Sequence, residues 1–493
     1  MRPLEYVLIA ALLLAAVSYF VAPRRRSSLL VYAPHIALLV ALVHGLIEGG
    51  RWSLYAAYLA AAVMAVFAVA RRRYESARDR PLARRVGGVL VVLVAVASAG
   101  AALAFPIFSL PEPSGAYKIG TRWLTLVDSS RTEDLTPDPS DLRHVVVRLW
   151  FPADSEVGDP SQYSAPAVSR VTAGALGLPG FVLSHLPLVK THSYQRARLA
   201  NASGKWPLLL FSHGYGVGTE SQNTVQMEEL ASHGYVVASI DHVHEAGAVP
   251  LPGDVVAAFQ APPSFTDTAA MARGLAMLER IASAPDTGAL LVAVRDMQRM
   301  VPSLDTSIVR WTDDTRFVLD RLTAMSAPSA GGDTLMVDRL ATDRVGVFGM
   351  SFGGATAATF CVLDARCVAG LNLDGLTYGA ATDSVMVRPF FFATSGGNAR
   401  MHEVFYERAV GPAFAMNVKG STHMDYTDLG LISPMLRRLG VLGPVGAGRM
   451  QEVMHAVVVG FFGRYVRGGE EVDLVGIGGR FVEVVVRGRG VGR

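Results

Sequence analysis

The chain has 493 residues, more than one ordinary domain needs, so its length predicts two or three structural units. Hydrophobic residues make up 51% and charged residues 18%, against about 25% charged in typical soluble proteins, which indicates a membrane-embedded part. The net charge of +3 comes without a Lys/Arg stripe interleaved with aromatic residues, so nucleic acid is not expected as a partner. Two cysteines, Cys361 and Cys367, are too few for a disulfide scaffold or a four-cysteine zinc site.

Apolar runs dominate the first 110 residues. Each run is close to the ~20 residues that cross a hydrocarbon core of ~30 Å, and none contains Asp, Glu, Lys or Arg. Several such runs, without a cleavage site leading into a mature domain, do not form a signal peptide. The sequence therefore predicts four transmembrane helices, over residues 6–22, 28–47, 53–70 and 87–108.

The connecting loops predict the orientation of these helices. Arg-rich loops at 24–26 and 71–85 belong on the cytoplasmic side, whereas the loop at 48–51 is nearly neutral. The N-terminus then lies outside the cell. Because the number of spans is even, everything after about residue 108 is also expected on the extracytoplasmic side of the plasma membrane. Cys361 and Cys367 could form a disulfide there, and two separate buried thiols are equally compatible with the sequence.

Two histidines, His35 and His44, lie within the second predicted span, where ionisable groups often mark a functional pathway. A spacing of nine residues places them on opposite faces of a helix. No acidic residue occurs inside another predicted span, so we expect two neutral histidines that pack separately in the bundle.

The soluble part begins after "PEPSG", which ends the helical pattern. Strand-like runs of β-branched and aromatic residues alternate with helix-like stretches at 220–233, 313–325 and 353–363. This alternation predicts an α/β fold with a mostly parallel, doubly wound sheet and polar ligand-binding residues at the strands' carboxyl ends. The strand-like runs cover residues 144–153, 206–214, 235–242, 344–351, 368–375, 388–395 and 413–423.

One of these strands ends in "GMSFG", a G-x-S-x-G pattern centred on Ser351. In this pattern the serine occupies a strained turn between a strand and a helix, and the glycines allow neighbouring backbone to approach. The amide N–H groups that open the helix face any anion formed there. We therefore predict that Ser351 is a nucleophile.

A serine nucleophile needs a base, and the base needs an orienting carboxylate, in the chain order Ser, acid, His. Asp374 ends the next strand in "LNLDG", and His423 follows the last core strand in "KGSTH". We predict these two residues as acid and base. The alternatives, which are not as well placed at the strands' carboxyl ends, are Asp364 and Asp383 for the acid and His402 and His455 for the base.

Two backbone donors should stabilise the oxyanion formed on attack. The N–H of Phe352 follows the nucleophile, and the N–H of Tyr215 lies in the glycine-rich loop "FSHGYGVG". His213 is interpreted as a structural histidine that braces this loop. The motif "DHVHE" at 241–245 is either a metal site or, as we favour, the rim of a pocket.

The motifs together resemble the platelet-activating factor acetylhydrolase family of the plasma and intracellular type II kind, a branch of the α/β-hydrolases. The resemblance covers most of residues 115–430. It implies a serine esterase that needs no calcium or other cofactor and acts on short or oxidised acyl chains at the sn-2 position of phospholipids. It also implies the triad Ser351, Asp374 and His423. The segments that carry it are "GAYKIGTRWLTLVD", "VVVRLWFPA", "WPLLLFSHGYG", "ELASHGYVVASIDH", "DRVGVFGMSFGGATA", "LNLDG" and "KGSTHMDYTD".

The predicted organisation is a transmembrane region at 1–110, an α/β-hydrolase domain at 111–467 and a tail at 468–493. Insertions near 155–202 and 246–310 are expected to form a cap or lid. The first contains "GALGLPGFVLSHLPLV", which would suit a lid, a contact with the bilayer surface or a helical cap.

These patterns lead to a membrane-anchored ester hydrolase acting on lipid-like or small esters outside the cell. An acyltransferase or a peptidase would use the same triad, and a protein that only binds a lipid or a partner is the alternative from another class. No metal or cofactor is expected, and the sequence leaves the oligomeric state open.

Overall fold

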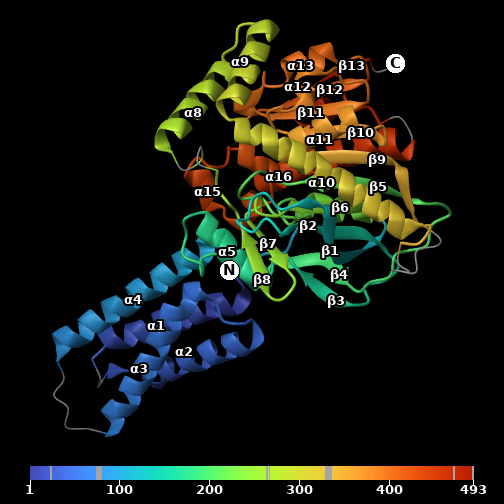
Figure 1. The fold of residues 1–493 in the computed structure, drawn as a ribbon. Helices are drawn as coiled ribbons and strands as arrows, with labels where there is room; N and C mark the ends of the chain where they lie inside the picture. The colour runs from blue at the N-terminus through green and yellow to red at the C-terminus, as the bar shows by residue number, and fades with distance from the viewer. Residues whose placement is uncertain are drawn as a thin grey trace. The chain divides into compact units, whose positions relative to one another are not determined.

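The computed structural model describes residues 1–22, 25–73, 80–262, 265, 267–327, 336–469 and 472–490 (Figure 1). The chain divides into two compact units. The helical unit contains Met1–Phe108 together with the short segments Phe181–Leu188 and Ile432–Met435. The remainder, Ser109–Gly180, Val189–Leu431 and Leu436–Arg493, forms the sheet unit.

Among the described residues, the helical unit contains four long helices that are apolar enough to cross a membrane, in agreement with the four predicted spans. Small residues such as Ala15, Ala37 and Ala61 are fully buried between the helices, while Leu39 and Leu46 face outward. This arrangement suits helices packed in lipid, where small side chains allow close approach. The helices are α1 (Pro3–Phe20), α2 (Ser28–Ile47), α3 (Tyr55–Arg73), which follows the 3₁₀ turn η2 (Trp52–Leu54), and α4 (Pro81–Ala104).

The expectation that His44 has no acidic neighbour in another span is wrong. Helix α1 begins at Pro3, earlier than the predicted run, and therefore includes Glu5. The His44 Nε2 atom lies 3.8 Å from the Glu5 carboxylate and 3.4 Å from that of Glu48. Arg2 and Arg51 pair with Glu5 as well, so the carboxylates are balanced by guanidinium groups.

The apolar segment expected to form a lid or a bilayer contact lies partly in the helical unit. The indole of Trp52 packs against Phe181, with ring centres 5.1 Å apart, and its Nε1–H donates to the carbonyl of Val182 at 3.2 Å. The hydroxyl of Ser433 donates to the carbonyl of Ala104 at 2.7 Å. Segments distant in sequence therefore pack onto the ends of the helices.

The sheet unit is built on an 11-stranded sheet in the order β13-β12-β11-β10-β9-β5-β6-β2-β1-β4-β3. The strands from β12 to β6 run parallel, and β13 and β2 pair antiparallel at either side of them. The strands are β1 (Lys118–Thr132), β2 (Leu142–Ala153), β3 (Asp159–Gln162), β4 (Lys190–Gln195), β5 (Trp206–Ser212), β6 (Val236–His242), β9 (Leu340–Met350), β10 (Cys367–Leu373), β11 (Phe390–Ser395), β12 (Ala413–Val418) and β13 (Val484–Arg489), with a separate hairpin of β7 (Ala248–Leu251) and β8 (Val255–Ala258).

All seven predicted strands are present, with shifted ends, and the mostly parallel sheet is confirmed. The first insertion supplies β3 and β4 to the sheet edge in addition to α5. The tail supplies β13, whose side chains alternate between buried and exposed and place Val484 and Val486 in the core.

Helices cover both faces of the sheet, and α10 crosses one face in Figure 1. Side chains of α10 and α11 form a core with one face, and those of α6 and α16 form a core with the other. The helices are α5 (Pro166–Ala175), α6 (Thr224–Ser232), α8 (Thr268–Ala282), α9 (Thr287–Met300), α10 (Pro302–Ser326), α11 (Phe352–Leu363), α12 (Ala380–Asp383), α13 (Glu403–Arg408), α14 (Leu429–Ile432), α15 (Met435–Arg438), α16 (Ala447–Phe462) and α17 (Ile477–Arg480).

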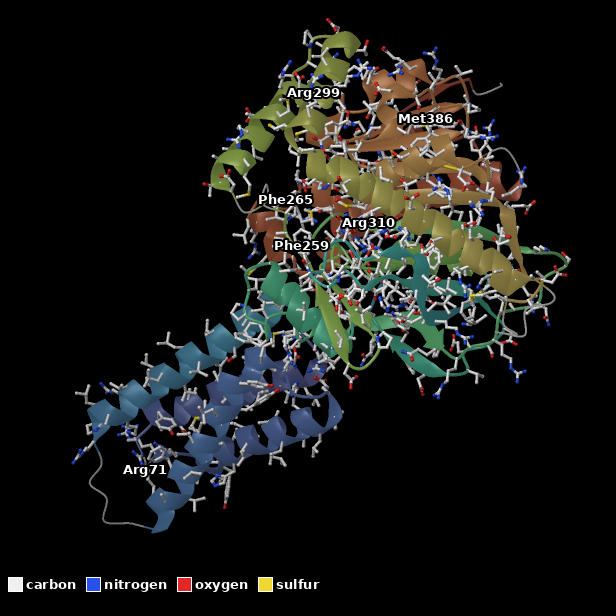
Figure 2. The ribbon with its side chains drawn as sticks, in the orientation of Figure 1. Arg71, Phe259, Phe265, Arg299, Arg310 and Met386 are labelled. Atoms are coloured by element: carbon white, nitrogen blue, oxygen red, sulfur yellow. A yellow bond between two sulfur atoms is a disulfide. The ribbon has the colours of Figure 1, made fainter. Side chains whose placement is uncertain are left out.

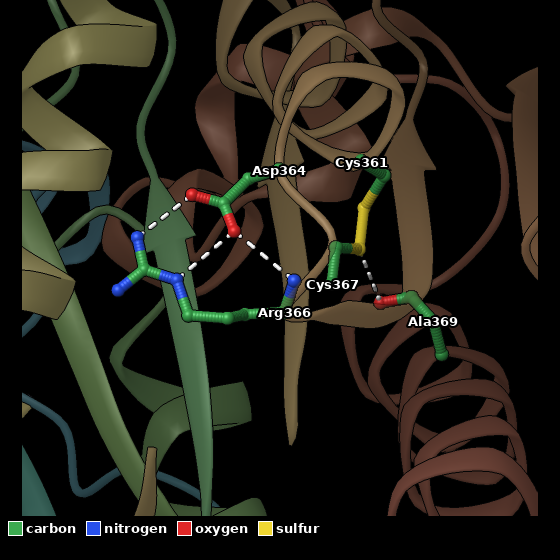
Figure 3. Close-up of a disulfide and its surroundings, with 5 residues drawn as sticks. All are labelled: Cys361, Asp364, Arg366, Cys367 and Ala369. Atoms are coloured by element: carbon green, nitrogen blue, oxygen red, sulfur yellow. Dashed lines mark hydrogen bonds and ion pairs between the residues drawn. A yellow bond between two sulfur atoms is a disulfide. The ribbon is translucent and has the colours of Figure 1, made fainter. Parts of the chain in front are cut away.

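A disulfide joins Cys361 near the end of α11 to Cys367 at the start of β10 (Figure 3). Within the turn that it closes, the Arg366 guanidinium pairs with the Asp364 carboxylate at 2.7 Å. Of the two fates left open by the sequence, the structure therefore has the disulfide.

Candidate active site

The corner between β9 and α11 has the geometry expected of a nucleophile. Ser351 has φ +56° and ψ −122°, a strained backbone conformation for a residue with a side chain. A Cβ on Gly353 would lie 2.0 Å from the carbonyl oxygen of Ser212, and one on Gly349 would lie 2.2 Å from the carbonyl carbon of Gly353. Glycine is therefore required on both sides of the serine, because backbone occupies the space of a side chain.

The structure brings Ser351, His423 and Asp374 together at the carboxyl ends of neighbouring strands. The Oγ of Ser351 lies 3.0 Å from His423 Nε2, and His423 Nδ1 lies 2.8 Å from Asp374 Oδ2. An ionised carboxylate can only accept, so Nδ1–H donates to Asp374 and leaves Nε2 to accept the serine proton. The His423 side chain is 39% exposed, whereas that of Asp374 is fully buried.

Further donors hold the Asp374 carboxylate. The backbone N–H of Ser395 donates to Oδ1 at 2.6 Å, and its hydroxyl donates to Oδ2 at 2.9 Å. The side-chain amide of Asn398 donates to Oδ2 at 3.0 Å. These contacts fix the carboxylate that orients the imidazole.

The alternative acids lie elsewhere. Asp383 pairs with Arg295 on the surface, where its side chain is 68% exposed. Asp364 pairs with Arg366 beside the disulfide.

The alternative bases are likewise outside this arrangement. His402 is buried against Phe392, with ring centres 5.1 Å apart, and burial lowers its pKa to about 4. His455 lies in α16, and its Nδ1 is 3.5 Å from the Glu229 carboxylate.

The loop after β5 packs against the serine corner. A Cβ on Gly214 would lie 3.5 Å from the Cβ of Ser351, and the Gly214 N–H donates to the Gln222 side chain at 2.8 Å. The next N–H along the chain, that of Tyr215, has no acceptor among the described residues. Phe352 is the first residue of α11, so its N–H has no carbonyl one turn earlier to bond. The two predicted oxyanion donors are therefore available.

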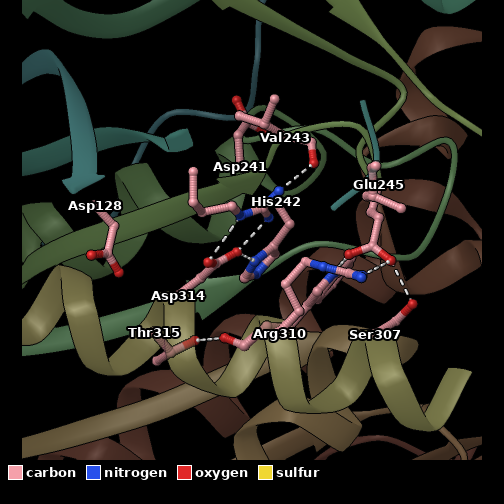
Figure 4. A network of polar contacts seen from close by, with 12 residues as sticks. Asp128, Asp241, His242, Val243, Glu245, Ser307, Arg310, Asp314 and Thr315 are labelled. Atoms are coloured by element: carbon pink, nitrogen blue, oxygen red, sulfur yellow. Dashed lines mark hydrogen bonds and ion pairs between the residues drawn. The ribbon is translucent and has the colours of Figure 1, made fainter. Parts of the chain in front are cut away.

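The motif at 241–245 is part of a buried polar network (Figure 4). His242 uses both ring nitrogens: Nδ1 lies 2.9 Å from Asp314 and Nε2 lies 3.1 Å from the hydroxyl of Ser212. The ring of Trp311 stacks on His242 at 3.9 Å. We interpret this motif as part of the packed interior, because both ring nitrogens of His242 already contact other residues of the protein.

Glu245 connects this network to the loop that carries Tyr215. Its backbone carbonyl accepts from the Gly216 N–H at 2.9 Å, and its carboxylate accepts from the hydroxyl of Tyr215 at 3.3 Å. The same carboxylate accepts from Arg310 at 2.7 Å and from the indole N–H of Trp311 at 2.8 Å. Through Glu245, α10 therefore fixes the conformation of the loop.

Burial and charge set the protonation of this network. Burial, together with the neighbouring His242, lowers the pKa of His213 to about 3. Burial alone would raise the pKa of Asp314, but Arg143 and His242 outweigh it and hold that pKa well below its usual range. The interior therefore contains a neutral His213 and an ionised Asp314, each next to His242. The structural role expected for His213 fits its contact with the carbonyl of Gly214 at 2.8 Å.

Several supporting residues were not predicted. Ser395 is the last residue of β11, at the same sheet edge as Asp374, so its position at the end of a strand could have predicted its role. Arg310 and Trp311 lie in the middle of a helix, and nothing in their local sequence indicates the loop that they support.

Comparison with known proteins agrees with this architecture. The family model described as "Platelet-activating factor acetylhydrolase, isoform II" matches residues 103–251 and 333–472. A "Probable 1-alkyl-2-acetylglycerophosphocholine esterase" of Arthroderma benhamiae is 25% identical over 60% of this chain and 66% of its own length. The "Platelet-activating factor acetylhydrolase" of Cavia porcellus is 23% identical over 73% of this chain and 78% of its own.

Among solved structures, a "Ferulic acid esterase from Streptomyces cinnamoneus" matches with a TM-score of 0.57 and 26% identity, covering 75% of this chain and 96% of that one. The likeness to an esterase structure and the parallel sheet covered by helices identify the α/β-hydrolase fold. The chain thus belongs to the platelet-activating factor acetylhydrolase, isoform II, family, a family of carboxylic ester hydrolases.

Proposed function

We propose that the protein is a membrane-anchored serine esterase that cleaves short or oxidised acyl esters of phospholipid-like substrates and thereby degrades lipids. The observation that carries the proposal is the connected series of contacts from Ser351 through His423 to Asp374, at 3.0 and 2.8 Å. The half-exposed His423 lies where a substrate can reach it.

The geometry supports acyl-enzyme chemistry. His423 Nε2 takes the proton of Ser351 as the hydroxyl oxygen attacks the ester carbonyl, and Asp374 stabilises the imidazolium. The N–H groups of Tyr215 and Phe352 donate to the oxyanion. His423 then protonates the leaving alcohol, and a water molecule activated by the same imidazole releases the acid.

The substrate class is inferred from the names of the relatives, two of which are acetylhydrolases or esterases of an acetylated glycerophospholipid. Aromatic rings surround Tyr215. The rings of Phe259 and Phe265, two residues labelled in Figure 2, each have their centre 5.5 Å from the centre of the Tyr215 ring. Both come from the insertion outside the matched residues 103–251 and 333–472. We therefore expect acyl-chain preference to be set by side chains particular to this protein.

The location proposed is the extracytoplasmic side of the plasma membrane. Four helices long enough to span a bilayer support the anchoring, and the Arg-rich loops support the orientation. The Cys361–Cys367 disulfide suits an oxidising compartment.

The test measures hydrolysis of p-nitrophenyl acetate and butyrate by the full-length protein in detergent, together with labelling by a fluorophosphonate. The Ser351→Ala variant should lose about 10³-fold or more of kcat and all labelling, since the nucleophile is absent. Ser212→Ala removes a serine that also contacts a histidine, and it should retain both activity and labelling. Turnover by Ser351→Ala at the wild-type rate would refute the proposal.

A further inference from the structure

A cavity of about 770 Å³ lies among the four long helices of the helical unit. Its volume falls within the roughly 300–1,000 Å³ of typical ligand sites. Most of its lining is apolar and comes from all of these helices, with Leu30, Val63 and Leu90 as examples. The cavity would therefore take a ligand that is largely hydrocarbon.

Small side chains leave this space open. Ala56, Ala60 and Ala68 from α3 and Gly87 from α4 line the cavity, so neither helix projects bulk at these positions. Pro34 lines it from within α2. A lining of small residues from two helices gives an elongated hydrocarbon chain room to lie between them.

The charged residues of the lining are all cationic. Arg26, Arg71 and Arg84 all border the cavity, and its described lining residues include no Asp or Glu. Arg84 is only 6% exposed, and its Nη1 donates to the carbonyls of Tyr19 at 2.6 Å and Val21 at 2.7 Å. Arg71 lies in the last turn of α3, at the end of the unit where Figure 2 labels it.

Holding a guanidinium at 6% exposure within an apolar helix bundle is costly, and such groups in spanning helices usually serve a ligand or a partner. Guanidinium groups bind phosphate or carboxylate through paired hydrogen bonds, and basic pockets between spanning helices suit the head groups of anionic lipids. We propose that this cavity binds an anionic membrane lipid, with an acyl chain among the apolar side chains and the head group at Arg26, Arg71 and Arg84.

The proposal rests on the embedding of the helices in a bilayer and is independent of ester hydrolysis. The positively charged loops favour the cytoplasmic leaflet for these arginines. The lipid would be bound between the helices of this unit. It would stabilise them by filling the space between α3 and α4 and by placing a negative charge next to the arginines.

The experiment uses the full-length protein purified in detergent and measures binding of dioleoylphosphatidylglycerol by native mass spectrometry. Dioleoylphosphatidylcholine and inorganic phosphate are tested in parallel. We expect the anionic lipid to bind one per chain and at least tenfold more tightly than the zwitterionic lipid, with no binding of phosphate alone. Equal binding of the two lipids, or binding of phosphate alone, would overturn the proposal.

Paired variants separate the site from general attraction to charge. Arg26→Gln with Arg71→Gln should weaken binding of the anionic lipid at least tenfold. Arg25→Gln with Arg85→Gln removes the same charge from neighbouring exposed positions outside the cavity and should leave binding unchanged. Equal losses in both pairs would show attraction to surface charge and refute the site.

A cavity-filling variant tests the apolar part. Ala60→Phe should exclude the acyl chain and abolish retention of the lipid, while circular dichroism confirms intact helices. Retained one-to-one binding in a folded Ala60→Phe protein would contradict the proposed position. If that variant does not fold, the paired arginine variants, which lie near the ends of the helices, still decide the question.

Discussion

Two Ser–His–Asp arrangements occur in the sheet unit, one open to solvent and the other buried. In the first, Ser351 lies 3.0 Å from His423, which lies 2.8 Å from Asp374. In the second, Ser212 lies 3.1 Å from His242, which lies 2.9 Å from Asp314. The distances are nearly the same, so distance alone does not distinguish a proposed nucleophile from a structural serine.

The difference lies in access and surroundings. The His423 side chain is 39% exposed, whereas His242 is fully buried beneath the ring of Trp311. Ser351 lies at a strained corner, beside N–H groups that have no acceptor among the described residues, while Ser212 ends a regular strand. Asp314 is also bound by Arg143 and so contributes to an interior ion-pair network. A serine needs a route for substrate and donors for the oxyanion before such a contact becomes catalytic.

The sharpest test of this contrast exchanges each carboxylate for an amide. Asp374→Asn should lower kcat for p-nitrophenyl acetate by about 10⁴-fold, because an amide favours the wrong imidazole tautomer. Asp314→Asn should instead lower the free energy of unfolding by about 3–5 kcal/mol, because it leaves the buried Arg143 short of a charge partner. Thermal unfolding and kcat of the folded fraction check both. The contrast fails if Asp314→Asn lowers kcat as strongly as Asp374→Asn.

A smaller effect is expected where the buried network meets the site. Glu245→Gln should lower kcat about tenfold with little change in KM, since a shifted Tyr215 N–H would weaken an oxyanion contact that forms only during reaction. Asp134→Asn, on the other side of Arg310, serves as the control and should leave kcat unchanged. A rise in KM with unchanged kcat would show that Glu245 acts on substrate binding instead.

An effect of similar size to that of Glu245→Gln is expected in acid. His213 has a pKa of about 3 in the folded protein. Its unfolded value is about 6.5, so the unfolded chain binds more protons between these values and stability falls as the pH drops below about 6.5. Lowering the pH from 7 to 5 should cost about 2 kcal/mol through this residue.

Denaturant unfolding of the full-length protein at both pH values measures this effect. His213→Gln should lose the contribution, and His144→Gln, at a more exposed position, should keep it. The same pH dependence in His213→Gln and the wild type would assign the acid sensitivity to other groups.

The strands and spans were predictable because each has a strong local pattern. Buried strands such as β5 and β10 are short apolar runs, and a spanning helix needs a long one, so composition alone identifies them. Strand β1 was missed because its exposed Arg and Thr residues interrupt the apolar pattern. The contact of His44 with Glu5 was missed because α1 extends beyond the apolar run.

The three residues Ser351, Asp374 and His423 could be predicted from the sequence because each follows a strand. The carboxyl ends of parallel strands meet at one edge of the sheet, so residues at these positions lie close together. Ser395 at the end of β11 obeys the same rule.

The sequence by itself determined the apolar spans, the alternation of strands and helices, and the strained serine corner, because these depend on neighbouring residues. Only the tertiary structure decided which of two similar Ser–His–Asp arrangements is open to solvent. It also decided that α10 holds the loop of Tyr215 and that arginines far apart in the chain border one cavity. Those features depend on packing between residues far apart in the chain, where burial and charge are set by neighbours that no local pattern specifies.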